Sequence, residues 1–254
     1  VGLGGEPGLG KSRFTQELRS YCEDMPVLSA SCDQYESATA YFPFRPLLRS
    51  LIDVELDGDP VANREALAQR LEQIDPELAP WSPLLAAPLD VEMASTAEVD
   101  ELEPSFRRAR LHGVVGSMLG KLVAEPTFFL FEDVHWMDEA SSDLLRFLAT
   151  GLSTRPWLAC TTRRPGAGGF AAAEGVPPVP ALTLRLEPLP VDDARKLVEA
   201  ASGSPLSDEE LATLTERGAG NPLFLQELAA AGGEATDELP DPADLRRRRN
   251  GLVK

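Results

Sequence analysis

The stretch GGEPGLGKSR, residues 4–13, has the residue types and the spacing of a phosphate-binding loop. Gly5, Gly10, Lys11 and Ser12 satisfy the pattern G-x-x-x-x-G-K-[S/T] in full. Glycines let a backbone close around an anion, because they tolerate positive φ and carry no Cβ. Backbone N–H groups and the amino end of the next helix then attract phosphate, while lysine reaches the β- and γ-phosphates and serine ligates Mg²⁺. The pattern therefore predicts a nucleotide-binding loop.

The whole loop is expected to contact the nucleotide, largely through its backbone. The residues assigned to it are Gly5, Glu6, Pro7, Gly8, Leu9, Gly10, Lys11, Ser12 and Arg13. The alternative is a Gly-Pro turn before an ordinary helix. The sequence that follows, KSRFTQELRSYCED, predicts a helix with Phe14, Leu18 and Tyr21 on one face, which is the context that a phosphate-binding loop requires.

Two acids form a second candidate group. Glu132 and Asp133 directly follow the apolar run FFLF, which is typical of a central parallel strand. A carboxylate at the end of such a strand can hold the Mg²⁺ that bridges the phosphates, often through water. We expect Glu132 to hold Mg²⁺ together with Ser12, and Asp133 to orient or activate the attacking water, with Lys11 as the third catalytic group. The first acid is glutamate, one methylene longer than the usual aspartate, so binding is a firmer expectation than hydrolysis.

Strands and helices alternate along the first three quarters of the chain, which predicts an α/β domain over 1–188. A smaller helical subdomain and the start of a linker are predicted over 189–254. Residues 75–102 hold several prolines and acids and are expected to be irregular or to form short helices. The predicted strands are 27–32, 127–132, 156–162 and 181–189. The predicted helices are 11–24, 45–56, 63–74, 103–125, 138–152, 191–201, 207–218 and 221–231, and Ser207 with Glu210 predicts a capping box at the start of helix 207–218.

The segment EDVHWMDEASSDLL resembles the DDLHWAD-x-x-S segment of the STAND class of AAA+-related ATPases, which are signal-transduction ATPases with numerous domains. The resemblance extends along the chain through GEPGLGKSR, YFPFRPLLR, CTTRRP and GAGNPLFLQEL. It implies a P-loop NTPase with a mostly parallel sheet flanked by helices, followed by a small helical subdomain. It also implies ATP/ADP and Mg²⁺ as cofactors; no residue by itself distinguishes adenine from guanine.

Further site residues follow from the resemblance. Thr161, Thr162 and Arg164 come at the end of the CTTRRP strand, where a polar sensor of the γ-phosphate is expected, although Arg164 could instead be solvated. Pro222 in GNP matches the proline that lies against adenine, and Asn221 with Pro222 also begins a helix unaided. His135, Trp136 and Asp138 match the family segment, but packing and helix capping explain them equally well.

Composition narrows the possible partners. The 254-residue chain has a net charge of −17 and a mean hydropathy of −0.15. The acid excess argues against direct nucleic-acid contact, and the absence of a run of about 18 apolar residues argues against a membrane span. The basic run Arg246–Arg249 is interpreted as a solvated tail. Three scattered cysteines, Cys22, Cys32 and Cys160, indicate a reducing, cytoplasmic compartment.

These observations predict an ATP-binding, slowly hydrolysing switch module of a larger bacterial signalling or transcription-regulating protein. Only VGLG precedes the loop, so we expect the segment to come from a longer chain, whose output and sensor domains would be its partners. Self-association on ATP binding is a further expectation. A small-molecule kinase or phosphotransferase is the first alternative, and an interaction scaffold without nucleotide is the second.

Overall fold

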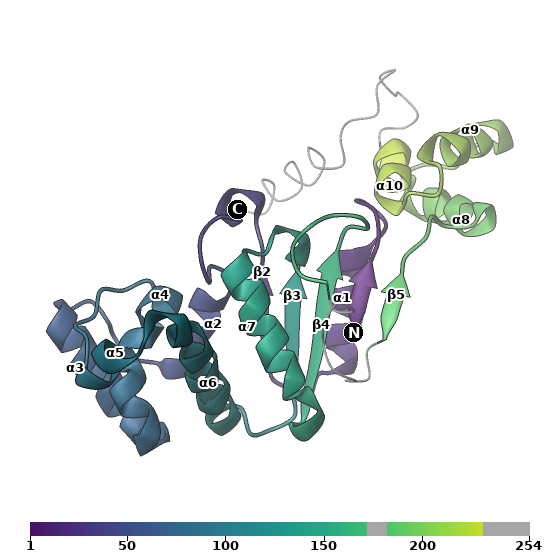
Figure 1. Ribbon diagram of the computed structural model, residues 1–254. Helices are drawn as coiled ribbons and strands as arrows, with labels where there is room; N and C mark the ends of the chain where they lie inside the picture. The colour runs from purple at the N-terminus through teal and green to yellow at the C-terminus, as the bar shows by residue number, and fades with distance from the viewer. Residues whose placement is uncertain (172–181, 231–254) are drawn as a thin grey trace. The chain divides into compact units, whose positions relative to one another are not determined.

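The computed structural model describes residues 1–171 and 182–230 of the chain (Figure 1). The basic run Arg246–Arg249, and part of the Gly- and Pro-rich loop after residue 163, lie outside the described residues. The chain comprises two compact units. The first consists of Val1–Gly2 and Cys22–Thr183, and the second of Leu3–Tyr21 and Leu184–Lys254. The predicted boundary between residues 188 and 189 stays a prediction.

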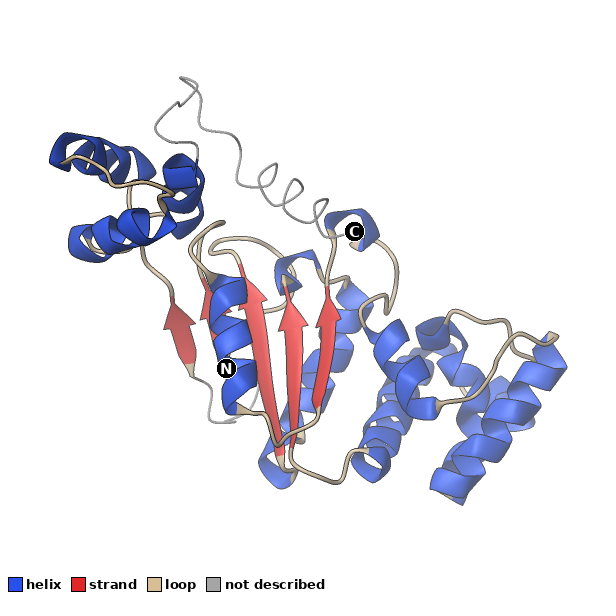
Figure 2. Cartoon of the chain, turned by 180° about the vertical axis from the view of Figure 1, so that it is seen from behind, coloured by secondary structure: helices blue, strands red, loops and turns tan. Residues whose placement is uncertain are grey.

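The strands form one sheet in the order β2-β3-β4-β1-β5. Their bounds are β1 Gly2–Gly4, β2 Val27–Ser31, β3 Thr127–Glu132, β4 Trp157–Arg163 and β5 Thr183–Arg185. Strand β3 pairs in parallel with β2 and β4, in registers that place Phe129 opposite Leu28 and Ala159 (Figure 2, strands in red). The first five residues of β3 are buried, as a continuous apolar run between two parallel neighbours requires.

Helices complete the first unit. They are α2 Phe44–Ile52, α3 Pro60–Ile74, α4 Ala86–Leu89, α5 Ala97–Glu101, α6 Pro104–Leu122 and α7 Glu139–Thr150, with a 3₁₀ segment over Pro76–Leu85. Their apolar faces share one core with the sheet, in which Leu144 of α7 and Met118 of α6 join Phe131 of β3. Figure 1 shows α7 running across the strands that carry this core. The irregular, short-helix prediction for 75–102 is confirmed.

The described residues of the second unit form α1 Lys11–Tyr21, α8 Val191–Ala201, α9 Asp208–Gly218 and α10 Pro222–Ala230. Helices α8–α10 bury their own core around Val198, Leu214 and Leu225. The predicted capping box of α9 is confirmed, since Ser207 and Glu210 each bond the backbone of the other. None of the helices in the described residues is both long and apolar enough to cross a membrane.

The elements agree with the sequence prediction in kind, but several bounds differ. Helices α1 and α2 end at Tyr21 and Ile52, three and four residues earlier than predicted, and Asp53 ends α2 in the left-handed conformation. Helix α3 begins three residues earlier than predicted, at Pro60, because Asp59 caps it.

Strand β5 covers Thr183–Arg185, three residues where nine were predicted, and residue 181 lies outside the described residues. At the other end, Pro188 has no N–H with which to extend the ladder. Helix α6 ends at Leu122, four residues before the Pro126 expected to end it. Tyr21, expected on the apolar face of α1, is 87% exposed, because the helix ends there and only Lys11 and Thr15 are buried along it.

Candidate functional site

The predicted phosphate-binding loop has the backbone that its glycines allow. Gly8 has φ +85° and Gly10 has φ +92°, both in the region that side chains with a Cβ rarely adopt. A Cβ at Gly10 would meet nothing within 4 Å, so backbone conformation alone requires glycine there. The Leu9 N–H donates to the Glu6 carbonyl (3.4 Å) and closes a turn over Pro7 and Gly8. Helix α1 begins at Lys11, directly after Gly10, so the positive end of the helix adjoins the loop.

Lys11 is folded over the start of this loop. Its side chain is only 5% exposed, although lysine is seldom buried without partners. The Nζ atom donates to the carbonyl oxygens of Gly5 (2.6 Å) and Glu6 (3.0 Å). These bonds hold a positive charge beside the loop backbone, and the contact of Lys11 with the β- and γ-phosphates stays a prediction.

The next two residues lie on the first turn of α1. Ser12 is exposed, and its role as a Mg²⁺ ligand stays a prediction. The Arg13 guanidinium forms an ion pair with Glu17, one turn along the helix, and both side chains are largely exposed. The predicted contribution of Arg13 to phosphate binding is therefore that of its backbone N–H.

The two predicted acids lie at the carboxyl end of β3. Glu132 is the last residue of the strand, and its carbonyl accepts a hydrogen bond from the Cys32 N–H (2.9 Å). Asp133 follows with φ +53° and ψ +41°, a left-handed conformation that costs about 1–2 kcal/mol for residues other than glycine and is best tolerated by Asn and Asp. Its N–H donates to Thr162 Oγ1 (2.9 Å). This bond fixes the turn that redirects the chain after the strand.

Thr162 lies at the strand end where the sequence predicts it, and it makes a contact that the sequence did not reveal. It is 2% exposed at the end of β4, and its hydroxyl oxygen accepts from the backbone of Asp133. The γ-phosphate sensor role stays a prediction for Thr161, Thr162 and Arg164. The Arg164 guanidinium lies 5.9 Å from the centre of the Trp136 ring, within the range of a cation–π contact.

The segment after the acids is a structural junction. Asp138 is the N-cap of α7, as one interpretation of the sequence predicted, because its Oδ1 accepts from the Ser141 N–H (2.8 Å). The same oxygen accepts from the N–H of Tyr41 (3.2 Å), which is buried and has φ +59°. Asp138 thereby ties the YFPF segment to the chain that leaves β3. His135 is 6% exposed and its ring centre lies 5.0 Å from that of Trp136.

Burial and two nearby aspartates change the pKa of Cys32. Burial, followed by the negative charges of Asp138 and Asp133, raises the pKa of the Cys32 thiol to about 12. Burial also raises the pKa of Cys160. Neither thiol is in the deprotonated form that a nucleophile or metal ligand requires near neutral pH.

We therefore expect iodoacetamide at pH 8 to alkylate Cys22 in the folded protein and to leave Cys32 and Cys160 intact. Cys22 is partly exposed, whereas about one Cys32 thiol in 10⁴ would be ionised at that pH. Peptide mass spectrometry after a short pulse measures the modification, and a urea-unfolded sample serves as the control in which all three react. Equal rates for Cys22 and Cys32 in the folded protein would contradict the burial of Cys32, which is 6% exposed.

The GNP segment lies in the second unit, as the loop does. Gly220 has φ +72°, and a Cβ there would lie 2.6 Å from the Leu189 carbonyl oxygen. Pro222 is the first residue of α10, as predicted, and its contact with adenine stays a prediction. Asn221 caps α10 and also donates from Nδ2 to the Pro7 carbonyl (2.9 Å). The cap was predictable from the residue types, whereas nothing in the sequence indicates the bond to Pro7.

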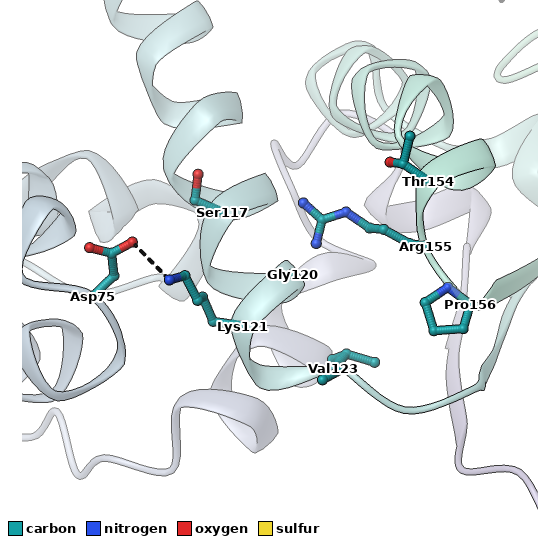
Figure 3. Close-up of a pocket in the computed structure, with 9 residues that line it drawn as sticks. Asp75, Ser117, Gly120, Lys121, Val123, Thr154, Arg155 and Pro156 are labelled. Atoms are coloured by element: carbon teal, nitrogen blue, oxygen red, sulfur yellow. Dashed lines mark ion pairs between the residues drawn. The ribbon is translucent and has the colours of Figure 1, made fainter.

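A polar pocket of about 490 Å³ lies elsewhere in the first unit (Figure 3). Its Lys121 pairs with Asp75 (3.7 Å), and Arg155 lies over the Trp157 ring at 4.7 Å and donates to the Gly116 carbonyl (3.1 Å). The pocket adjoins the start of β4, whereas ligands of open α/β sheets bind outside the carboxyl ends of the strands. We do not assign it to the nucleotide site.

Ser12 and Glu132 carry oxygen donors, the kind of ligand that Mg²⁺ takes in nucleotide sites. In the described ranges, 1–171 and 182–230, no group of three or more His, Cys, Asp or Glu side chains is placed to hold a metal by itself. Mg²⁺ in nucleotide sites needs no such cage, because it is held by one or two protein oxygens, water and the substrate phosphates. Ser12 and Glu132 are the protein oxygens that the sequence proposes.

A glycine-rich loop, a buried lysine that donates to its carbonyls, and a helix that begins directly after the loop define the P-loop class of nucleotide-binding proteins. The chain belongs to the family described as the AAA ATPase domain, whose model matches residues 1–159. This confirms the AAA-related resemblance and the P-loop NTPase fold.

One solved structure similar to this chain is that of a signal transduction ATPase with numerous domains (STAND) protein with a tetratricopeptide repeat sensor, from Pyrococcus horikoshii. The two are 16% identical, with a TM-score of 0.42, over 100% of this chain and 30% of that one. This chain thus spans less than a third of the length of that protein. No curated protein matches the sequence.

Proposed function

We propose that the chain is the ATP-binding switch module of a larger signalling protein of the STAND class. The observation that carries the proposal is the loop of residues 5–12, with positive φ at Gly8 and Gly10 and with Lys11 buried against its carbonyls. Membership of the AAA ATPase domain family supports nucleotide binding. The segments EDVHWMDEASSDLL and GAGNPLFLQEL support the STAND assignment.

The loop amides and Lys11 would bind the β- and γ-phosphates, and Ser12 and Glu132 would hold Mg²⁺, which neutralises charge on the phosphate oxygens when it is bound. Asp133 would orient or deprotonate the attacking water. The positive φ of Asp133 and its bond to Thr162 support this role, because strained, tightly held residues occur at functional sites. Slow turnover fits a switch, in which bound ATP and bound ADP favour different arrangements.

The wider setting is also part of the proposal. Output and sensor domains of the same longer chain would be the partners, with self-association on ATP binding and a cytoplasmic location. Direct nucleic-acid contact is not proposed for this segment, given its net charge of −17.

Two other functions make different predictions. A small-molecule kinase would form a phosphorylated product besides ADP and phosphate. A scaffold would bind its partners without nucleotide, but the buried, hydrogen-bonded Lys11 has no evident use in it.

Equilibrium binding of a fluorescent ATP analogue tests the proposal. We expect saturable binding that strengthens at least about tenfold with Mg²⁺, as for a metal-bridged phosphate site. Competition with unlabelled ATP, ADP and GTP would establish the preferred base. The segment is measured as it stands and with additional upstream sequence. Absence of binding by both proteins would overturn the proposal and leave the scaffold.

A further inference from the structure

The Asn221 side chain contacts two segments that are far apart in the sequence. Its Oδ1 accepts from the N–H groups of Leu223 (3.1 Å) and Phe224 (3.4 Å), which is the ordinary N-cap of a helix. Its Nδ2 donates to the carbonyl oxygen of Pro7 (2.9 Å), 214 residues earlier. The amide thus uses its acceptor for α10 and its donor for the phosphate-binding loop.

A second hydrogen bond joins the same two segments. The Leu223 N–H also donates to the Gly8 carbonyl oxygen (3.3 Å). A Cβ at Gly8 would lie 2.8 Å from Asn221 Nδ2, so only glycine allows this approach. We call the bonds from Asn221 to Pro7 and from Leu223 to Gly8 the Asn221 bridge.

The helical end of the bridge is fixed within its own bundle. The Leu189 N–H donates to the Gly220 carbonyl (2.8 Å), directly before Asn221. Leu225, one turn into α10, is fully buried against α8 and α9. The first turn of α10 is therefore held by the bundle, and the bridge transmits that constraint to the loop.

The bridge binds carbonyl groups of the loop, not its amides. The two bonds hold the carbonyls of Pro7 and Gly8 toward α10 and so orient this part of the loop, while the loop amides are not used by the bridge. The loop needs such support, because glycine residues have more backbone freedom to lose on ordering than any other residue. A loop already ordered before binding gives a higher affinity, since less entropy is lost when the anion arrives.

We infer that Asn221 is a positioning residue that couples nucleotide binding at the loop to the first turn of α10. The inference rests on the proposed function and adds to it a connection that does not depend on adenine or Pro222. Because coupling between two sites is reciprocal, nucleotide must also strengthen the bridge.

Two substitutions separate the bridge from the helix cap. In Asn221→Ser the serine is still a good N-cap, but its shorter side chain cannot donate to Pro7. In Asn221→Ala the side chain can neither cap α10 nor donate to Pro7. Ser207→Ala is the matched control, because it removes the N-cap of α9, an exposed cap for which the structure gives no bond to the loop. All are made in the whole chain, and thermal unfolding is measured for each.

Asn221→Ser removes the bond from Asn221 to Pro7, and this loss is expected to weaken binding of the fluorescent ATP analogue about tenfold. The unfolding temperature of this variant should stay close to that of wild type. Ser207→Ala should lower the unfolding temperature and leave affinity unchanged. Hydrogen exchange gives an independent readout. Nucleotide should slow exchange of the Leu223 and Phe224 amides in wild type and have little effect on them in Asn221→Ser.

The outcomes are distinguishable. Wild-type affinity in Asn221→Ser, or equal slowing of exchange in both proteins, would overturn the inference and leave the proposed function intact. Failure of wild type to bind nucleotide would overturn the proposed function and the coupling with it.

Discussion

Replacing Lys11 by alanine is expected to weaken ATP binding by a factor of about 150. The Nζ atom is buried and held beside the loop by the carbonyls of Gly5 and Glu6, so its charge lies where water screens it little. Removing one partner of a buried charge pair costs about 2–5 kcal/mol, and about 3 kcal/mol corresponds to this factor. Titration with the fluorescent ATP analogue in the presence of Mg²⁺ measures the loss.

The alanine variant also removes the donor that Gly5 and Glu6 use, which affects the loop itself. Lys11→Gln is therefore the companion variant, because it keeps a donor and removes the charge. Lys121→Ala controls for the loss of a lysine elsewhere, since that side chain is 59% exposed and pairs only weakly with Asp75. Wild-type affinity in both Lys11 variants would exclude the loop as the phosphate site.

Local chemistry made much of this fold predictable. Asp138 and Ser207 were identified as caps because capping depends on a residue and the three that follow it. Strand β3 was identified because a continuous apolar run bounded by Pro126 and two acids suits a buried parallel strand. The loop was identified because its glycines and lysine have a fixed spacing.

Contacts between distant segments were not predictable in this way. The sequence indicates that Asn221 begins a helix, but nothing near it indicates that its amide donates to Pro7. Thr162 was expected at the end of a strand, whereas its bond to the Asp133 N–H depends on the register of β3 with β4. Likewise, nothing near Tyr41 indicates that its N–H donates to Asp138, 97 residues away. Asn221 and Asp138 are explained locally as helix caps and Thr162 as the end of a strand, so their residue types did not point to a further contact.

The residues proposed for nucleotide binding and those proposed for hydrolysis belong to different compact units. The loop, Lys11, Asn221 and α10 all belong to one compact unit, so the contacts that order the loop can be described directly. The acids belong to the other unit, where their own contacts are equally well defined. Substitution of the acids therefore tests a chemical role that the loop variants do not address.

Asp133→Asn is expected to lower the rate of ATP hydrolysis about 100-fold and to change ATP affinity less than about twofold. An amide cannot accept the proton of the attacking water, and loss of a general base costs about 10²–10⁴ in rate. Asparagine tolerates the left-handed backbone as aspartate does, and its N–H can still donate to Thr162. The substitution therefore changes the charge without adding the strain that alanine would introduce at φ +53°.

Single-turnover release of phosphate, with ATP affinity measured in parallel, distinguishes the roles of the two acids. Glu132→Gln should raise the Mg²⁺ concentration needed for half-maximal binding, because Glu132 is the proposed metal ligand, whereas Asp133→Asn should not. Glu139→Gln, in the exposed first turn of α7, is the control for loss of a nearby carboxylate. Wild-type hydrolysis by Asp133→Asn would restrict Asp133 to shaping the turn after β3 and would make Glu132 the candidate base. Loss of hydrolysis at unchanged affinity would instead show that the strained turn presents Asp133 for catalysis.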